Sequence, residues 1–303
     1  MTPRIGVDLG GTKIEIAAFD DAGRTLVRRR VPTPASDYER IIGTIRELVV
    51  AAEAEIGERA SVGIGTPGAV SRATGLIKNA NSTVLIGKPL ERDLTAALGR
   101  EIRLANDANC FALSEAVDGA GAGLPCVFGV ILGTGVGGGI VFDARPLSGH
   151  NAIAGEWGHN PLPWPQADEL PGRVCYCGKR GCIETFLSGP AFARDHVARN
   201  GGALDAPTIA HEAAAGDVAA GFSLERYIDR LARALACVIN LLDPDAIVLG
   251  GGVSNVAGLA ERASQRLRDY VFSDVVSTPV RRAVHGDSSG VRGAAWLWPF
   301  VDK

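Results

Sequence analysis

The sequence predicts an α/β protein built from two related halves, and three observations lead to this prediction. The 303 residues correspond to roughly two domains, at about 150 residues per domain. Short segments with alternating apolar residues stand between segments with helical periodicity. A unit of strand, glycine-rich turn and strand occurs twice, with Thr12 in the first turn and Thr134 in the second.

The first half opens with two strands that a turn connects. Ile5, Val7 and Leu9 alternate with other residues, and residues 14–18 alternate in the same way after the turn 10–13. The other elements predicted in this half are helices over 37–56, 90–98 and 107–117 and strands over 61–65 and 102–104. The three arginines at 28–30 are interpreted as a solvated strand end.

The second half repeats the opening unit and then becomes richer in loops and helices. Strands are predicted over 127–132, 140–142 and 246–249, a loop-rich stretch over 150–190, and helices over about 190–240. A closing helix is expected over 289–298, capped by Ser288 or Ser289. We predict a small N-terminal domain over 1–118, joined by a C-terminal helix at about 290–303. A large domain over 119–289 would contain a metal-binding loop at 156–184.

Composition excludes several classes of protein. The chain has 34 acidic and 31 basic residues, so we expect neither a nucleic-acid nor a membrane partner. The N-terminus lacks the apolar core of a signal peptide, and no stretch approaches the roughly 20 apolar residues of a membrane span. We therefore expect a soluble, cytoplasmic protein, in which the six cysteines are thiols or metal ligands rather than disulfides.

The glycine turns are candidates for binding phosphate. Gly133, Gly135 and Gly138 match the dinucleotide pattern G-x-G-x-x-G, but a strand follows them where that site needs a helix. Two interpretations remain, a tight hairpin or a turn whose backbone N–H groups bind an anion. Asp8, at a strand end beside the first turn, is suited to hold a hydrated Mg²⁺.

A cluster of potential metal ligands lies in the second half. Cys175, Cys177 and Cys182 fall within eight residues, and His159 precedes them. Three thiolates and one imidazole would complete a tetrahedral, structural Zn²⁺ site, and the alternative is free thiols with a surface histidine. We expect no chemical role for His211, which has no ligand-spaced partner.

These motifs together resemble a known family. The turns at 8–13, 133–135 and 250–252 resemble the ATP-binding turns of the actin-like ATPase and sugar kinase superfamily, which implies two ribonuclease-H-like domains with an interdomain cleft. Within that superfamily, Glu156-x-Gly158-His159 and the cysteine segment resemble the ROK family. This resemblance implies zinc bound by His159, Cys175, Cys177 and Cys182, and a homodimer.

The resemblance also implies an ATP-dependent sugar kinase. Asp107, in the pattern Asn-Asp-x-Asn, would be the general base, although from its position alone it could equally cap a helix. The residues implied in binding Mg-ATP are Asp8, Gly10, Gly11, Thr12, Lys13, Gly133, Thr134, Gly135, Gly251 and Gly252. Those implied in binding the sugar are Gly68, Asn81, Asn106, Glu156, His159 and Glu184.

The identity of the sugar rests on three stretches. Residues 78–83, 156–164 and 286–293 resemble bacterial fructokinases of the ROK family, which favours phosphorylation of the 6-hydroxyl of D-fructose. N-acetylglucosamine, N-acetylmannosamine or a broad range of hexoses are the alternatives. A sugar-sensing ROK regulator is a less favoured alternative. Such regulators carry a helix-turn-helix domain before the first glycine hairpin, and here four residues precede Ile5.

Overall fold

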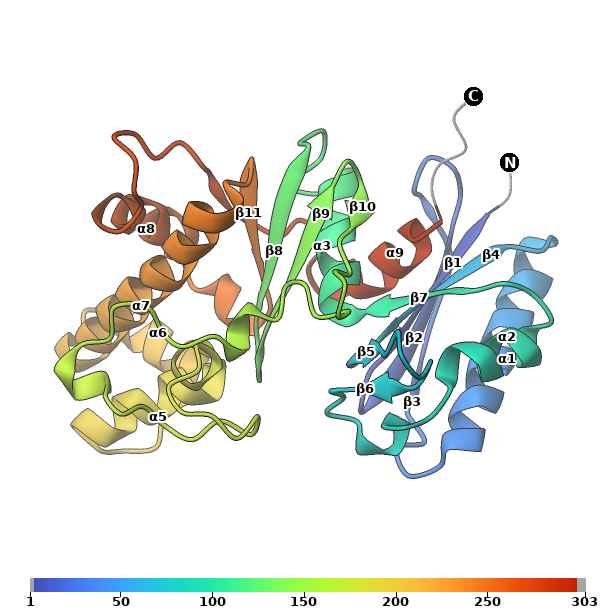
Figure 1. Ribbon diagram of the computed structural model, residues 1–303, viewed down its shortest axis with the longest axis horizontal. Helices are drawn as coiled ribbons and strands as arrows, with labels where there is room; N and C mark the ends of the chain where they lie inside the picture. The colour runs from blue at the N-terminus through green and yellow to red at the C-terminus, as the bar shows by residue number, and fades with distance from the viewer. Residues whose placement is uncertain (1–2, 299–303) are drawn as a thin grey trace. The chain divides into compact units, whose positions relative to one another are not determined.

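The computed structural model describes residues 3–298 of the chain (Figure 1). The strands are β1 (Arg4–Leu9), β2 (Lys13–Phe19), β3 (Thr25–Pro32), β4 (Ser61–Thr66), β5 (Ala69–Val70), β6 (Ile77–Lys78), β7 (Arg103–Asn106), β8 (Cys126–Leu132), β9 (Val136–Phe142), β10 (Arg145–Pro146), β11 (Ala246–Gly250) and β12 (Val280–Arg282). The α-helices are α1 (Tyr38–Ile56), α2 (Leu90–Leu98), α3 (Asp107–Asp118), α4 (Glu184–Leu187), α5 (Gly189–Asn200), α6 (Ala206–Ala214), α7 (Val218–Leu242), α8 (Leu259–Arg266) and α9 (Ser289–Trp296). The α/β class is confirmed.

The first five-stranded sheet has the order β3-β2-β1-β4-β7. β1 pairs antiparallel with β2 and parallel with β4, and β4 pairs parallel with β7. The carboxyl ends of β1, β4 and β7 therefore lie at one edge, where the chain continues as Gly10, Pro67 and Asp107. Ligand-binding groups gather at such edges in open α/β sheets.

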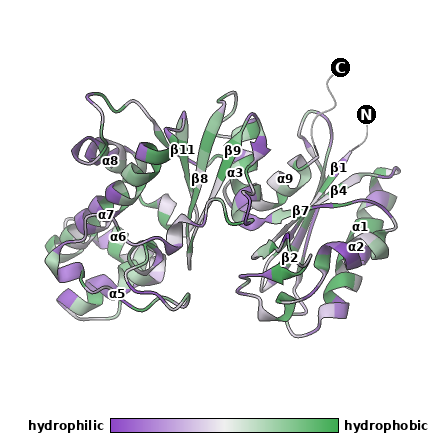
Figure 2. Ribbon diagram, in the orientation of Figure 1, coloured by the Kyte–Doolittle hydropathy of each residue, from purple (hydrophilic) through white to green (hydrophobic). Residues whose placement is uncertain are grey.

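The second five-stranded sheet has the order β10-β9-β8-β11-β12. β11 pairs parallel with both β8 and β12, and all five of its residues are buried. Figure 2 shows the hydrophobic character of β8 and β11 along most of their length. The carboxyl ends of these two neighbouring strands lead into the glycine turns at Gly133 and Gly251.

The described residues group into two compact units. One comprises residues 3–119, 139–154 and 287–298, and the other comprises 120–138 and 155–286. Residues 139–154 thus differ from the predicted division, which placed them in the large domain. Gly139 explains the difference, because its backbone lies against α3: a Cβ on Gly139 would be 2.6 Å from the carbonyl oxygen of Ala108.

Several elements depart from the sequence-based predictions. The arginines at 28–30 belong to a complete strand, β3, and Arg28 and Arg30 bind Glu15, which is 1% exposed. The closing helix ends at Trp296, and residues 299–303 of its predicted range lie outside the described part of the chain. Ser288 holds the N-cap position of α9 without a side-chain cap bond, while the Ser289 hydroxyl donates to Glu115.

Helix length and hydropathy show whether a helix could span a membrane. Among the described residues, no helix combines the length and apolar character needed to cross a bilayer. The longest, α7, carries charged residues along its course, including Arg230 and Arg233. Both arginines are buried and bind Glu169.

At three glycines, helix α9 packs directly against the backbone of its neighbours or lays its own backbone against them. A Cβ on Gly293 would lie 1.6 Å from the carbonyl oxygen of Cys110 on α3. Cβ atoms on Gly6 of β1 and Gly63 of β4 would each lie 1.8 Å from carbonyl oxygens of α9. These three glycines therefore allow α9 to contact two strands and a helix at the closest possible range.

We predict that Gly293→Ala destabilises the protein, because its methyl group meets backbone that cannot rotate away. Overpacking of this kind costs about 1–3 kcal/mol or more in unfolding free energy. Urea unfolding followed by circular dichroism measures the loss. Gly43→Ala in α1 is the matched control, since nothing lies within 4 Å of a Cβ there. That helical substitution should instead raise the unfolding free energy by about 0.5–1 kcal/mol. Equal midpoints for the two variants would contradict the packing argument.

Candidate functional site

Two aspartates stand at the same edge of the first sheet. Asp8 is the penultimate residue of β1, and Asp107 begins α3 directly after β7. Burial, and after it the negative charge of Asp107, raises the pKa of Asp8 to about 6. Lys13 and Arg30 act in the opposite direction and do not offset this increase. The edge therefore carries two carboxylates close enough to repel each other.

Asn106 caps helix α3 and also fixes a neighbouring turn. Its Oδ1 accepts a hydrogen bond from the N–H of Ala108 at 2.9 Å, and its Nδ2 donates to the carbonyl of Gly68 at 3.1 Å. Asp107 Oδ1 lies 2.8 Å from the same N–H of Ala108. Asn106 is thus the N-cap, and Asp107 is the first helical residue. Asn81, the other asparagine of the predicted set, lies exposed after β6.

The first glycine turn is a tight hairpin between β1 and β2. The N–H of Gly10 donates to the carbonyl of Lys13 at 2.9 Å, and the Thr33 hydroxyl donates to the carbonyl of Gly10 at 2.7 Å. Gly11 and Thr12 at its tip are exposed. Hydrogen bonds at its base therefore fix the turn, while the backbone and the Thr12 hydroxyl at its tip are exposed to solvent.

The second glycine turn lines a cavity of about 860 Å³ in the second unit. Gly133 and Thr134 contribute to the lining together with Gly252, which begins the short 3₁₀ helix Gly252–Asn255. Residues of α5 and α6 complete it, among them Pro190, Pro207, Ala210 and His211. Its size and mostly small, apolar lining suit a small-molecule ligand.

Two further predicted glycines have structural roles beside this cavity. Gly251 has φ +82°, and a Cβ on it would lie 2.5 Å from the carbonyl oxygen of Leu132. A Cβ on Gly135 would lie 2.6 Å from Oε2 of Glu184. Both glycines therefore permit close approaches next to the turn. After Gly135 the chain continues as strand β9, which contains Gly138, so no helix follows and G-x-G-x-x-G is not a dinucleotide motif in this chain.

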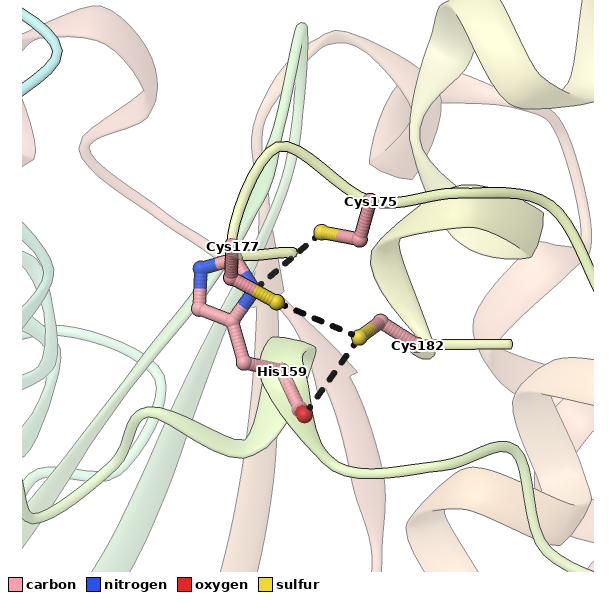
Figure 3. A group of neighbouring side chains, drawn as sticks. All are labelled: His159, Cys175, Cys177 and Cys182. Atoms are coloured by element: carbon pink, nitrogen blue, oxygen red, sulfur yellow. Dashed lines mark hydrogen bonds between the residues drawn. The ribbon is translucent and has the colours of Figure 1, made fainter. Parts of the chain in front are cut away.

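The predicted metal ligands converge in the second unit (Figure 3). His159 ends the 3₁₀ helix Trp157–His159, and the cysteines come from the loop that follows. One ligand atom from each of His159, Cys175, Cys177 and Cys182 lies within 4.8 Å of the others. Gly178 and Gly181, at φ +86° and +70°, let this loop turn back on itself.

The spacing of these atoms fits a tetrahedral zinc ion. Zn–S and Zn–N bonds of about 2.3 and 2.0 Å give tetrahedral edges of about 3.8 Å between sulfurs and about 3.5 Å between sulfur and nitrogen. Sγ of Cys177 lies 3.6 Å from Sγ of Cys182, and Sγ of Cys175 lies 3.5 Å from Nδ1 of His159. The hydroxyl of Tyr176 lies 2.9 Å from Nε2, so the ring is held from its far side as in known metal centres.

Two glutamates accompany the metal ligands. Glu156 precedes the 3₁₀ helix of His159, and its carbonyl accepts from the N–H of His159. Glu184 begins α4, two residues after Cys182, and its Oε2 accepts a hydrogen bond of 2.9 Å from the N–H of Val136. One oxygen of Glu184 is therefore bonded to backbone, which the sequence did not indicate.

The helical wall of the large cavity was not predicted from the sequence. His211, expected to have no chemical role, lies in this wall with Asp205 and Pro207. The alanine-rich pattern of α6 predicts a helix, but the pattern is the same whether its small side chains face protein or a ligand. Asn109 is another omission: it lines a cavity of about 390 Å³ in the first unit, next to Asn106.

We predict that Asp8→Asn stabilises the protein at neutral pH. The pKa of about 6 exceeds the ordinary 3.8, so between about pH 4 and 6 the folded protein binds more protons than the unfolded one. The stability that this group contributes therefore falls as pH rises through that window. The variant should gain about 2–3 kcal/mol in unfolding free energy at pH 7.5, and nothing near pH 4. Urea unfolding across this range, with exposed Asp143→Asn as control, measures the difference. A gain that is independent of pH would show that the raised pKa of Asp8 is not its cause.

Comparisons with known proteins agree with these motifs. Residues 4–300 match the model of the ROK family. The N-acetyl-D-glucosamine kinase of Salmonella paratyphi C is 43% identical over 296 residues, which cover 96% of this chain and 98% of that protein.

Solved structures with the same fold include a ROK hexokinase from Thermus thermophilus, with TM-score 0.86, 35% identity, and coverage of 98% of this chain and 97% of that one. A ROK glucokinase from Streptomyces griseus, solved with glucose and AMPPNP, gives TM-score 0.77 and 30% identity, with coverage of 97% and 98%. The family match spans nearly the whole chain and includes both glycine turns, Asp107 and the metal cluster. This protein is therefore a member of the ROK family.

Proposed function

We propose that this protein is an ATP-dependent sugar kinase that phosphorylates a hexose. The observation that carries the proposal is its 43% identity, over nearly its full length, to an N-acetyl-D-glucosamine kinase. A relative that is 30% identical was solved with glucose and an ATP analogue together. The homodimer implied by the family resemblance stays a prediction.

The nucleotide would bind to the cavity and the glycine turns. In this proposal the large cavity takes the adenosine, with Gly251 and Gly252 beside it, and Gly133, Thr134 and Gly135 contact the phosphates. The first turn, Gly10 to Lys13, is a further proposed phosphate-binding element, through its backbone N–H groups and the Thr12 hydroxyl. Mg²⁺ enters with ATP and neutralises charge on the phosphates, and Asp8 is the carboxylate suited to hold it through water.

Asp107 would be the general base. As the sugar hydroxyl attacks the γ-phosphorus, its proton passes to the Asp107 carboxylate, and the bond from that phosphorus to the bridging oxygen of ADP breaks. The position of Asp107 supports this role, because Asn106 already caps the helix and the Asp107 carboxylate is placed by the helix start.

Six residues are proposed to bind the sugar: Gly68, Asn81, Asn106, Glu156, His159 and Glu184. Carboxylates accept hydrogen bonds from sugar hydroxyls, and Nε2 of His159, which faces the Tyr176 hydroxyl here, would be the ring atom that donates to the sugar. The bond between Asn106 and Gly68 supports a shared role, since it fixes the Gly68 turn beside Asp107.

The comparisons favour N-acetylglucosamine over fructose as the sugar. N-acetyl-D-glucosamine kinases from strains of Salmonella are 43% identical to this chain. Fructose remains a second candidate, because the stretches 78–83, 156–164 and 286–293 resemble ROK fructokinases. Discrimination between the two depends on how polar groups of the site match substituents around the sugar ring.

A coupled ADP-release assay with Mg-ATP tests the function and the substrate together. We expect turnover on a hexose well above the rate without sugar, and the ratio of kcat/KM for N-acetylglucosamine and fructose ranks the two candidates. Asp107→Asn should lower kcat by about 10²–10⁴ with little change in sugar affinity, because a positioned base contributes about that factor. Asp143→Asn, a surface control, should behave as wild type. Near-normal turnover by Asp107→Asn would refute its role as base.

We also propose that the cluster of His159, Cys175, Cys177 and Cys182 holds a structural zinc ion. Zinc with four protein ligands fixes the loop that carries Glu156 and Glu184 and leaves no open position for catalysis. Burial raises the pKa of Cys175 and of Cys182, so the thiolate forms of these cysteines need a cation beside them.

Cys177→Ser should therefore lose bound zinc. Elemental analysis of purified wild type should give about one zinc per chain, and the variant well under half of that. Cys237→Ser is the control, because Cys237 lies on α7 outside the cluster. Wild-type protein that purifies without zinc and cannot be loaded with it would refute the proposal, as would full zinc content in Cys177→Ser.

A further inference from the structure

A short segment connects the metal ligands to the second glycine turn. Glu184 begins α4, and its Oε2 accepts a hydrogen bond of 2.9 Å from the N–H of Val136, the residue directly after the turn. At the other end of the segment, the N–H of Gly189 donates to the carbonyl of Gly133 at 2.8 Å. Residues 184–189 are thus bonded to both flanks of the turn.

The Glu184 carboxylate fits closely against this turn. A Cβ on Gly135 would lie 2.6 Å from Oε2, so a larger residue there would displace the carboxylate from Val136. The segment itself is anchored, because the hydroxyl of buried Tyr227 donates to the carbonyl of Leu187 at 2.7 Å. Movement of the turn would therefore have to break the bond to Glu184.

The same residue is tied to the metal ligands. Its Oε1 lies 4.0 Å from Sγ of Cys175. The carbonyl of Cys182 accepts hydrogen bonds from both the N–H and the hydroxyl of Thr185, at 2.8 and 2.7 Å. The start of α4 therefore follows the position of Cys182, and a displacement of that cysteine would shift the Glu184 carboxylate with it.

We infer that Glu184 is a positioning residue that couples occupancy of the metal cluster to nucleotide binding at the Gly133–Gly135 turn. This inference rests on the proposed kinase function, which assigns phosphate binding to that turn. An occupied cluster fixes Cys182 and α4, and the Glu184 carboxylate then holds the N–H of Val136. Because coupling free energies are reciprocal, bound nucleotide must also strengthen retention of the metal.

Titration calorimetry with Mg-ADP tests the coupling in the zinc-loaded protein. Glu184→Ala should weaken binding about ten-fold or more, because it removes a charged acceptor from a backbone donor. Glu184→Gln keeps an oxygen that can accept from Val136 and should stay within about three-fold of wild type. Glu261→Ala removes an exposed carboxylate of α8, outside the proposed site, and should leave the Mg-ADP affinity unchanged. Unchanged Mg-ADP affinity in Glu184→Ala would overturn the inference.

Removal of zinc is the second test of the coupling. Chelation should weaken Mg-ADP binding by wild type about as much as Glu184→Ala does, and should weaken binding by Glu184→Ala little further. If chelation weakened Mg-ADP binding equally in wild type and Glu184→Ala, the coupling would not depend on Glu184. Where chelation unfolds the protein, the rate of zinc release into a chromophoric chelator decides: Mg-ADP should slow release from wild type and not from Glu184→Ala.

The two proposals fail in different ways. Wild-type protein that does not bind Mg-ADP would refute the proposed kinase function, and the coupling with it. Wild-type protein that binds Mg-ADP, but releases zinc at the same rate with and without it, would refute the coupling alone.

Discussion

The first unit depends on direct contact between the backbone of α9 and that of β1, β4 and α3. Gly6, Gly63 and Gly293 leave no side chain in this contact, where any Cβ would fall within 2 Å of a carbonyl oxygen. The contact places the start of α3 relative to the sheet edge. Gly290 extends the constraint, since a Cβ on it would lie 3.1 Å from the Asp8 carboxylate. Backbone packing therefore sets the distance between the two aspartates that the proposed chemistry uses.

The parts of the site with local sequence signals could be predicted. The period-two pattern around the first turn predicted β1 and β2, and the spacing of Cys175, Cys177 and Cys182 predicted a cluster whose geometry fits zinc. The position of Asp107 between strand and helix was also predictable, because an extended run followed by a polar residue and a helical pattern marks such a junction. In each case neighbours in the sequence remain neighbours in space.

The remaining features depend on contacts between distant residues. Glu184 binds the N–H of Val136, 48 positions away, and Arg30 binds Glu15 on the adjacent strand. The wall of the large cavity comes from α5 and α6, whose patterns do not show which face a ligand would meet. Residues 139–154 belong to the first unit, although the predicted boundary placed them in the large domain. The chain changes units within β9, and no change in composition marks that position.

Glu169 and Asp8 are two carboxylates in opposite environments. Burial alone would raise the pKa of Glu169, but hydrogen bonds from Arg233 and Arg230 lower it to about 2, so its charge is stabilised by the fold. Asp8 has the opposite environment, because burial and the charge of Asp107 raise its pKa to about 6. Glu169 is paired with two arginines, whereas Asp8 lies beside another acid. The repulsion between Asp8 and Asp107 lowers the free energy of unfolding and favours a cation at this position. The Mg²⁺ that accompanies the proposed nucleotide would satisfy that preference. Nucleotide binding would then bring the positive charge that the fold does not place beside Asp8.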